Sequence, residues 1–313
     1  MNNDSLAVLL LTNRLVDVDE KPLTAKEIWS LYARVPQLGQ VLDCTAEALV
    51  SEHGLDRAEA ERIKKLCDAA IAFTFEMERL EESGIRVLSF LDDGFPKRLT
   101  NALGTKSSAF LLVAGNINLF DKPGRGIVGS RNASEEIISV AQSAANAAVK
   151  QGDVVVSGLA KGVDRVAMSA ALEVDGEVIG VPTEGIRRIA KANDIRNLVH
   201  EGRICLVSPY APDVGFSVGL AMGRNKLVYA LSESTLVVAS DLEKGGTWAG
   251  ADEALKGDFA QVDVWTGEGA TKGNVALVAK GARAVPTREE FWQSGFIPAP
   301  AVFDTDPEQL KLF

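Results

Sequence analysis

Apolar residues recur at helical spacing along the first part of the chain. Thr24 can cap a helix whose apolar positions follow three and four residues apart. A longer amphipathic stretch covers about 56–82 and stops before Gly84, the residue type that often ends a helix. These patterns predict a small helical domain over residues 1–84. We interpret it as a packed bundle, with a module that binds a helical partner or DNA as the alternative.

From residue 85 onward, short β-branched runs alternate with helical patterns. Strands are expected at 85–90, 126–128, 153–157, 178–181, 204–207, 235–239 and 261–265. Strands that alternate with helices imply crossovers between parallel strands. The sequence therefore predicts an α/β fold over residues 85–285, a Rossmann-like doubly wound and mostly parallel sheet. Residues 286–313 are expected to form an acidic tail that contains prolines.

Charge is unevenly distributed along the 313 residues, whose net charge is −10. Residues 1–84 hold 9 basic and 16 acidic residues, whereas residues 85–285 hold 22 of each. The overall acidity argues against a general polyanion binder. The neutral central part still allows local basic clusters that could form a nucleic-acid groove.

Composition narrows the class of protein further. No apolar run approaches the ~18 residues of a membrane span, and the N-terminus lacks the basic region of a signal peptide. The three cysteines follow no metal-ligand spacing, and the chain has two histidines. We therefore expect a cytoplasmic protein with reduced thiols, no membrane segment and no metal site.

Two expected strands end at glycine and pass directly into helical patterns. The first reads Gly129-Ser130-Arg131, and the second runs from Ser157 and Gly158 through Lys161 and Gly162 to Asp164. Such loops expose backbone N–H groups and a helix N-terminus to an anion, most often a phosphate. Loops on consecutive parallel strands lie side by side at the carboxyl edge of the sheet. The sequence therefore predicts a phosphate-binding site there.

Common nucleotide cofactors do not fit these loops. The first loop lacks the second glycine of G-x-G-x-x-G, and the Walker pattern G-x-x-x-x-G-K-[ST] is absent. We therefore expect no nicotinamide, P-loop nucleotide or other cofactor.

Four elements of the chain resemble the DNA-processing protein A (DprA, also called Smf) family. That family has an I-V-G-[ST]-R loop, an S-G-[LM]-A-[RK]-G-[IV]-D loop, an R-N-[RK] element and a glycine-rich third loop. The corresponding residues here are 127–131, 157–164, Arg224-Asn225-Lys226 and Gly245-Gly246-Thr247. Asn193 stands where the family has a further Asn. Met168 departs from the pattern, because the family often has His four residues after the motif Asp.

The resemblance implies a non-catalytic protein that binds single-stranded DNA, forms a homodimer and passes the strand to a RecA-type recombinase. Asp164 is expected to organise the loop or the helix N-terminus rather than to contact DNA. The residues then expected at the DNA or phosphate site are Gly129, Ser130, Arg131, Ser157, Gly158, Lys161, Gly162, Asp164, Asn193, Arg224, Asn225, Lys226, Gly245, Gly246 and Thr247.

An enzymatic alternative comes from related folds. Nucleotide phosphoribohydrolases of the lysine-decarboxylase-like (LOG) group have P-G-G-x-G-T-x-x-E near the third loop. Here Gly245-Gly246-Thr247 lacks the second G-T spacing, although Asp252 or Glu253 could act as a general acid or base. A nucleotide-binding hydrolase is therefore the second functional hypothesis.

The end of the chain carries a third motif. Gln309, Leu310, Leu312 and Phe313 resemble the Q-L-[SD]-L-F peptide by which bacterial proteins dock on the replication sliding clamp. The resemblance implies a clamp-binding tail, and the alternative is a tail that folds back on its own domain.

Overall fold

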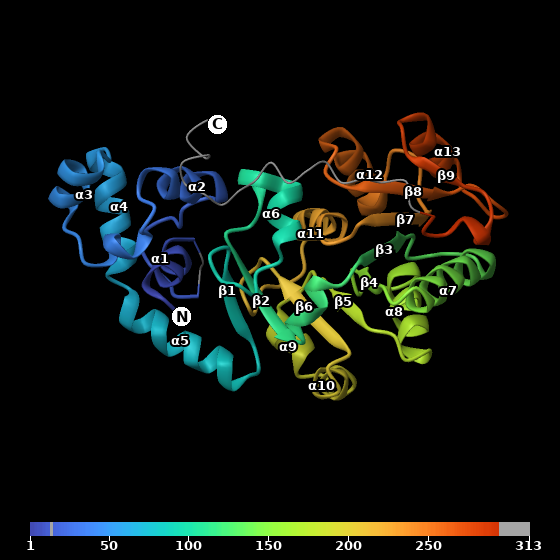
Figure 1. Cartoon of the computed structure of the whole chain (residues 1–313), viewed down its shortest axis with the longest axis horizontal. Coiled ribbons are helices and arrows are strands. Elements are labelled where there is room, and N and C mark those ends of the chain that lie inside the picture. Colours follow the sequence, from blue (N-terminus) through green and yellow to red (C-terminus); the bar gives the residue numbers. More distant parts are fainter. Residues whose placement is uncertain (13–14, 294–313) are drawn as a thin grey trace. The chain divides into compact units, whose positions relative to one another are not determined.

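The computed structural model describes residues 1–12 and 15–293, and the chain separates into two compact units (Figure 1). The first unit comprises Met1–Val113 and Pro209–Pro212, and the second begins at Ala114 and holds the other described residues. The sliding-clamp-like motif Gln309–Phe313 lies outside the described residues. Within the described part of the chain, no helix is long and apolar enough to span a membrane.

Helices dominate the first unit, as the apolar periodicity predicts. Thr24 forms a complete capping box with Glu27, and Asp56 caps the fourth helix through the N–H of Glu59. The amphipathic stretch expected over 56–82 forms two helices rather than one, because Asp68 and Ala69 form a turn between them. The break leaves the apolar spacing intact, so periodicity alone could not reveal it. The helices are α1 (Asn3–Thr12), α2 (Ala25–Arg34), α3 (Ala46–His53), α4 (Arg57–Cys67) and α5 (Ala70–Glu82).

An antiparallel strand pair packs against these helices, and all of it except Ala114 and Gly115 belongs to the same unit. Strands β1 (Arg86–Ser89) and β2 (Phe110–Gly115) flank helix α6 (Lys97–Leu103). The ring of Phe90, just after β1, lies 4.0 Å from that of Trp29 on α2, measured between centroids. The domain boundaries expected at residues 84 and 285 remain a proposal.

The second unit contains the predicted parallel sheet. Its strands follow the order β6-β5-β4-β3-β7-β8-β9, and each pair for which a register is defined is parallel. The Rossmann-like α/β fold is thus confirmed. The strands are β3 (Gly124–Gly129), β4 (Val154–Ser157), β5 (Val178–Gly180), β6 (Ile204–Ser208), β7 (Ser234–Ala239), β8 (Gln261–Trp265) and β9 (Arg283–Val285).

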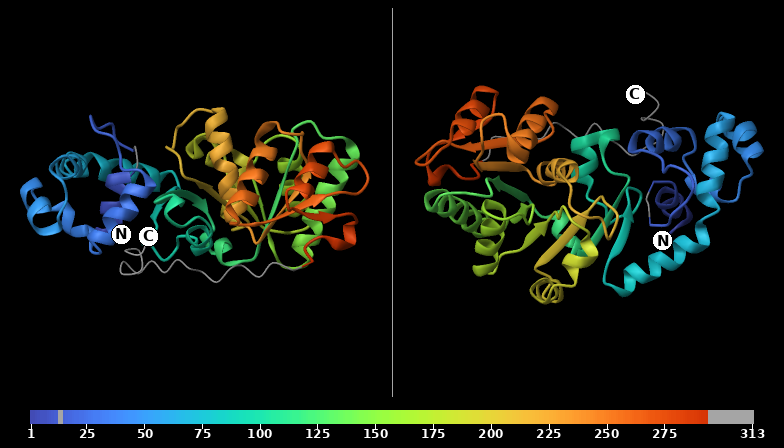
Figure 2. Two further views of the ribbon diagram at one scale, coloured as in Figure 1. Left: turned by 90° about the horizontal axis from the view of Figure 1, so that it is seen from above. Right: turned by 180° about the vertical axis from the view of Figure 1, so that it is seen from behind.

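Helices cover both faces of this sheet (Figures 1 and 2). Helices α7 and α8 pack on one face, and α11, α12 and α13 form the layer on the other. The two layers arise because right-handed crossovers that run in opposite directions along a sheet place their helices on opposite faces. The helices are α7 (Glu135–Lys150), α8 (Val163–Glu173), α9 (Ile186–Ala190), α10 (Asn193–His200), α11 (Val218–Ala230), α12 (Gly245–Gly257) and α13 (Lys272–Ala279).

Candidate nucleic-acid interface

The site lies where the direction of strand addition reverses. Strand β3 sits between β4 and β7, so the chain leaves β3 toward one side and reaches β7 on the other. Ligands of open α/β sheets bind in the crevice at such a switch point, beyond the carboxyl ends of the strands. The three predicted glycine loops follow β3, β4 and β7, and the fold therefore brings them to one crevice.

The first two loops touch each other closely. Gly162 has φ +82°, and an ideal Cβ there would lie 2.4 Å from the carbonyl oxygen of Ser130. A Cβ on Gly129 would lie 2.7 Å from Cγ2 of Val163. Ser157 donates a hydrogen bond of 2.6 Å to the carbonyl of Ile127. These glycines therefore serve close loop packing, and the side-by-side arrangement predicted for the loops is present.

Asp164 holds the two loops together from the first turn of α8. Its carboxylate accepts hydrogen bonds from the backbone N–H groups of Gly129 and Ala160. Nη1 of Arg224 donates a third at 3.3 Å. Burial raises the pKa of the Asp164 carboxyl, while the Arg224 guanidinium and the two N–H donors oppose that rise. The amide of Gly129, a residue expected at the phosphate site, and the amide of Ala160 in the second loop are thus used by a carboxylate of the chain itself.

Arg224, one of the residues expected at the DNA or phosphate site, is buried. Its exposure is 4%. Gly158 makes room for it, since an ideal Cβ there would lie 1.0 Å from Nη1 of Arg224. A buried charge requires a partner, and Asp164 supplies it. The charge of Arg224 is therefore matched by Asp164, and Arg224 also lines the crevice cavity described below.

The rest of the R-N-K element supports the third loop. Nδ2 of Asn225 donates a 2.7 Å hydrogen bond to the carbonyl of Gly246. Nζ of Lys226 lies 2.5 Å from Oε1 of Glu253 on α12. Asn225 and Lys226 thus join α11 to α12.

The predicted site residue Asn193 lies apart from this group. It is exposed at the start of α10, next to residues that line a cavity.

Two neighbouring cavities open at this edge of the sheet. The crevice cavity, of about 660 Å³, lies between the first loop, α11 and the start of α12. The α8–α10 cavity, of about 850 Å³, lies between those two helices. Both are lined by Arg131, Ala160 and Phe216. Predicted site residues that line the crevice cavity are Gly129, Ser130, Arg131, Asp164, Arg224, Asn225, Gly245, Gly246 and Thr247. Those that line the α8–α10 cavity are Arg131, Gly158 and Lys161.

The N-terminus of α12 faces the crevice cavity without a side-chain cap. Lys244 at the N-cap position accepts no hydrogen bond from the helix, and Gly245 takes a left-handed backbone with φ +79°. The first N–H groups of a helix have no partner within the helix and carry partial positive charge. The third loop is therefore the part of the predicted cradle best suited to an anion.

Exposed cations surround the two cavities. Arg131, Lys161, Arg165 and Lys244 line them, and within residues 1–12 and 15–293 none of the four forms an ion pair. Arg131 also lies over the ring of Phe216, 5.7 Å from its centroid. Phe216 is 50% exposed. The edge therefore combines unneutralised positive charge with an exposed aromatic ring.

Sequence reasoning missed Arg165, Phe216, Lys244 and Tyr229. Arg165 directly follows the second motif and Lys244 directly precedes the third, so extending each motif by one residue would have found them. Phe216 precedes α11 in a segment without periodic pattern. Tyr229 is buried on α11 and also lines the crevice cavity.

The acid and base candidates of the enzymatic alternative do not line either cavity. Asp252 pairs with Lys256 and Lys280, and hydrogen bonds from both lysines lower its pKa. Glu253 pairs with Lys226. Both carboxylates are therefore engaged on α12, away from the crevice.

Comparison with known proteins agrees with this geometry. The model of the DNA recombination-mediator protein A family matches residues 86–295. The chain belongs to this family. The match covers the sheet and its three loops, so the phosphoribohydrolase alternative is not favoured.

Two similar proteins are named DNA processing protein DprA. DNA processing protein DprA of Bacillus subtilis is 27% identical over 235 residues, which cover 72% of this chain and 76% of that protein. DprA of Streptococcus pneumoniae is 29% identical over 163 residues, covering 50% of this chain and 55% of that protein.

Two solved structures share the fold. The structure of S. pneumoniae DprA has a TM-score of 0.60 and 22% identity, covering 86% of this chain and 98% of that one. The Helicobacter pylori DprA structure, whose title describes a single-stranded DNA binding mode, has a TM-score of 0.55 and 24% identity. It covers 66% of this chain and 93% of that one.

Proposed function

We propose that this chain binds single-stranded DNA along the carboxyl edge of its parallel sheet and acts in DNA processing and recombination without catalysing a reaction. The observation that carries the proposal is the group of exposed cations at the switch point, which form no ion pair with any described residue, in a chain with net charge −10. Family membership and the DNA-binding relative from H. pylori support it.

The strand would run from Lys244 and the N-terminus of α12, past Arg131, to Lys161 and Arg165. Cations of this kind bind phosphates without reading sequence. Phe216 would offer a ring on which a base can stack, a mode common in proteins that bind single strands. Because Asp164 already accepts from Gly129 and Ala160, side chains rather than those two amides would hold the phosphates.

The first experiment is a binding titration with labelled oligonucleotides, single and double stranded. We expect weaker binding from each of three variants, Arg131→Ala, Lys161→Ala and Arg165→Ala. Each should also reduce the slope of log affinity against log salt concentration by about 1, the effect of losing one phosphate contact. Lys150→Ala is the matched control. Lys150 is exposed at the C-terminus of α7, whereas the first loop of the site lies before the N-terminus of that helix. Affinities equal to that of wild type in all three variants would contradict the site.

The expected partners belong to the same proposal. We infer a homodimer that delivers its strand to a RecA-type recombinase, and a tail that docks on a sliding clamp through Gln309–Phe313. Deletion of residues 309–313 should abolish clamp binding, and an unchanged affinity would remove that partner. The cytoplasmic location also remains a prediction.

A further inference from the structure

A third cavity lies within the first unit, and we call it the first-unit cavity. Its volume of about 970 Å³ is at the upper end of the range of roughly 300–1,000 Å³ typical of ligand pockets. Leu10 of α1, Leu66 of α4 and Phe73 of α5 give it an apolar wall, and residues 16–22 supply most of the remaining lining. None of these residues belongs to the strand path proposed above, so DNA binding leaves this cavity without a role.

The lining segment alternates between apolar and acidic residues. Val16 and Val18 are half-buried, whereas Asp17 and Asp19 are exposed. A period of two is the pattern of an extended strand with one side on an apolar surface. The segment therefore has the side-chain arrangement of a strand, although it belongs to no sheet.

The backbone of this segment has unused hydrogen-bonding groups. Residues 16–19 form no backbone hydrogen bond with any other described residue. The segment is held further on, where Arg62 donates to the carbonyls of Lys21 and Pro22 at 2.8 and 2.6 Å. An anchored, extended segment with free N–H and C=O groups is a template for pairing with another strand.

Carboxylates dominate the rim of the cavity. Asp17 and Asp19 form no ion pair with any described residue, and Glu20 lies 3.4 Å from Nζ of Lys65. Among the described lining residues, Lys21 is the single cation. The rim therefore carries a net negative charge, which attracts Lys and Arg side chains.

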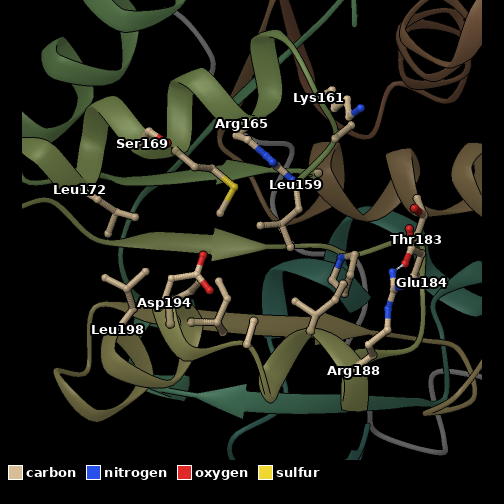
Figure 3. Close-up of a pocket in the computed structure, with 18 of the residues that line it drawn as sticks. Leu159, Lys161, Arg165, Ser169, Leu172, Thr183, Glu184, Arg188, Asp194 and Leu198 are labelled. Carbon is tan, nitrogen blue, oxygen red and sulfur yellow. Dashed lines mark ion pairs between the residues drawn. The ribbon is translucent and has the colours of Figure 1, made fainter.

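The charge of this cavity is opposite to that of the strand-binding edge. Figure 3 shows Lys161, Arg165 and Arg188 at the α8–α10 cavity, which cations line. Residues 1–84 hold 9 basic and 16 acidic residues. Phosphates and a second acidic copy of this unit would both be repelled, so the fitting occupant is a basic segment of another protein.

We propose that the first-unit cavity docks an extended segment of a partner protein in which apolar residues alternate with Lys or Arg. The main chain of that segment pairs with residues 16–19, its apolar side chains enter the cavity, and its basic side chains lie beside Asp17 and Asp19. This mode is strand addition, in which main-chain hydrogen bonds give affinity and pockets for alternate side chains give specificity. It goes beyond the proposed DNA binding and does not depend on it.

The test begins with a random library of twelve-residue peptides displayed on phage and selected on the full chain. The enriched peptides are synthesised, and their affinities are measured by fluorescence anisotropy. Lys or Arg should alternate with apolar residues in them. Enrichment of acidic peptides alone, or of none, would overturn the proposal.

Two variants assign the enriched peptides to the cavity. The double variant Asp17→Asn, Asp19→Asn should weaken binding about tenfold and reduce its salt dependence. Ala69→Trp places an indole in the cavity from the turn between α4 and α5, and should also weaken binding about tenfold. Affinities equal to that of wild type in both variants would overturn the site.

Matched controls come from α5. Glu78→Gln with Glu82→Gln removes two exposed carboxylates outside the cavity, and Ala72→Trp adds an exposed indole there. Both controls should bind the peptides as wild type does, and equal losses in controls and cavity variants would overturn the site. Because Asp17 and Asp19 are exposed, their variant keeps the test decisive even if Ala69→Trp fails to fold.

Backbone methylation of the best peptide tests strand pairing. Alternate N–H groups of a strand point to the same side, so methylating every second nitrogen should weaken binding about tenfold in one phase and little in the other. Equal effects of the two phases would indicate a helix or side-chain contacts alone and overturn strand addition. Peptide affinity that falls as protein concentration rises would assign the cavity to a second copy of this chain.

Oligonucleotide titrations separate this proposal from the proposed function. All four variants should bind single strands as wild type does. Loss of single-strand binding by wild type would contradict the proposed function alone, whereas loss of peptide selectivity alone would overturn the docking site.

Discussion

Nη1 of Arg224 lies where a side chain on Gly158 would begin, 1.0 Å from an ideal Cβ. Gly158→Ala should therefore expel the guanidinium from its place beside Asp164 and leave a buried carboxylate without its counter-charge. Breaking a buried pair costs about 3–5 kcal/mol, and we expect a loss of stability near the lower value. Urea unfolding measures it.

Gly219→Ala is the control for that substitution. Gly219 lies on α11, the helix that carries Arg224, and a Cβ there meets no atom within 4 Å. Alanine favours a helix over glycine by about 1 kcal/mol, so this variant should be as stable as wild type or slightly more so. An equal loss in both variants would show that the space at Gly158 is unimportant.

The Asp164–Arg224 pair should behave as one unit. Asp164→Asn leaves a buried guanidinium uncompensated, and Arg224→Met leaves a buried carboxylate, so each should lower the free energy of unfolding by about 3 kcal/mol. The double variant should lose much less than the sum. A double-mutant cycle from urea unfolding measures the coupling, and additive losses would contradict it.

Phe216 should contribute to binding of single strands but not to folding. Its ring is half exposed and lies beneath Arg131, so Phe216→Ala should weaken oligonucleotide binding by about 1 kcal/mol while leaving thermal unfolding unchanged. Phe75→Ala is the control, because Phe75 is an exposed phenylalanine on α5. Equal effects of the two substitutions on affinity would argue against base stacking at Phe216.

Glu27 should make the first unit sensitive to acid. Partial burial acts to raise the pKa of Glu27, but the Arg62 guanidinium and the backbone N–H of Thr24 outweigh it and bring the pKa to about 2. A carboxyl with a depressed pKa stabilises the fold above its ordinary pKa of 4.5, and this contribution is lost as the pH falls toward 2.

The Glu27 side chain is 41% exposed, so solvent screening reduces the stabilisation to about 1 kcal/mol. Between pH 5 and pH 2, wild type should lose that much more stability than Glu27→Gln. Urea unfolding at several pH values checks the difference. Parallel curves for the two proteins would contradict the assignment.

The sheet was predictable because β-branched runs and glycine stops are local signals. The strand expected at 261–265 matches β8 residue for residue, whereas the three-residue β9 is too short for its pattern to be seen. The cavities depend on contacts across long separations. Asp164 and Arg224 are 60 positions apart, and no local pattern shows that this arginine is buried.

The same limit applies to the α8–α10 cavity. The amphipathic pattern of α10 predicts an apolar side, but only the spacing between α8 and α10 reveals that this side borders a hollow. Phe216 carries no motif, because its importance comes from its exposure.

The carboxylate of Asp164 has a kinetic consequence for the glycine loops. Since the chain supplies its own anion to the amides of Gly129 and Ala160, the loops keep their shape before any ligand arrives. A strand that reaches this edge meets a prearranged surface, and little ordering of the backbone accompanies association. Encounter should then be governed by long-range attraction to Arg131, Lys161, Arg165 and Lys244, with association rates that fall steeply as salt is added.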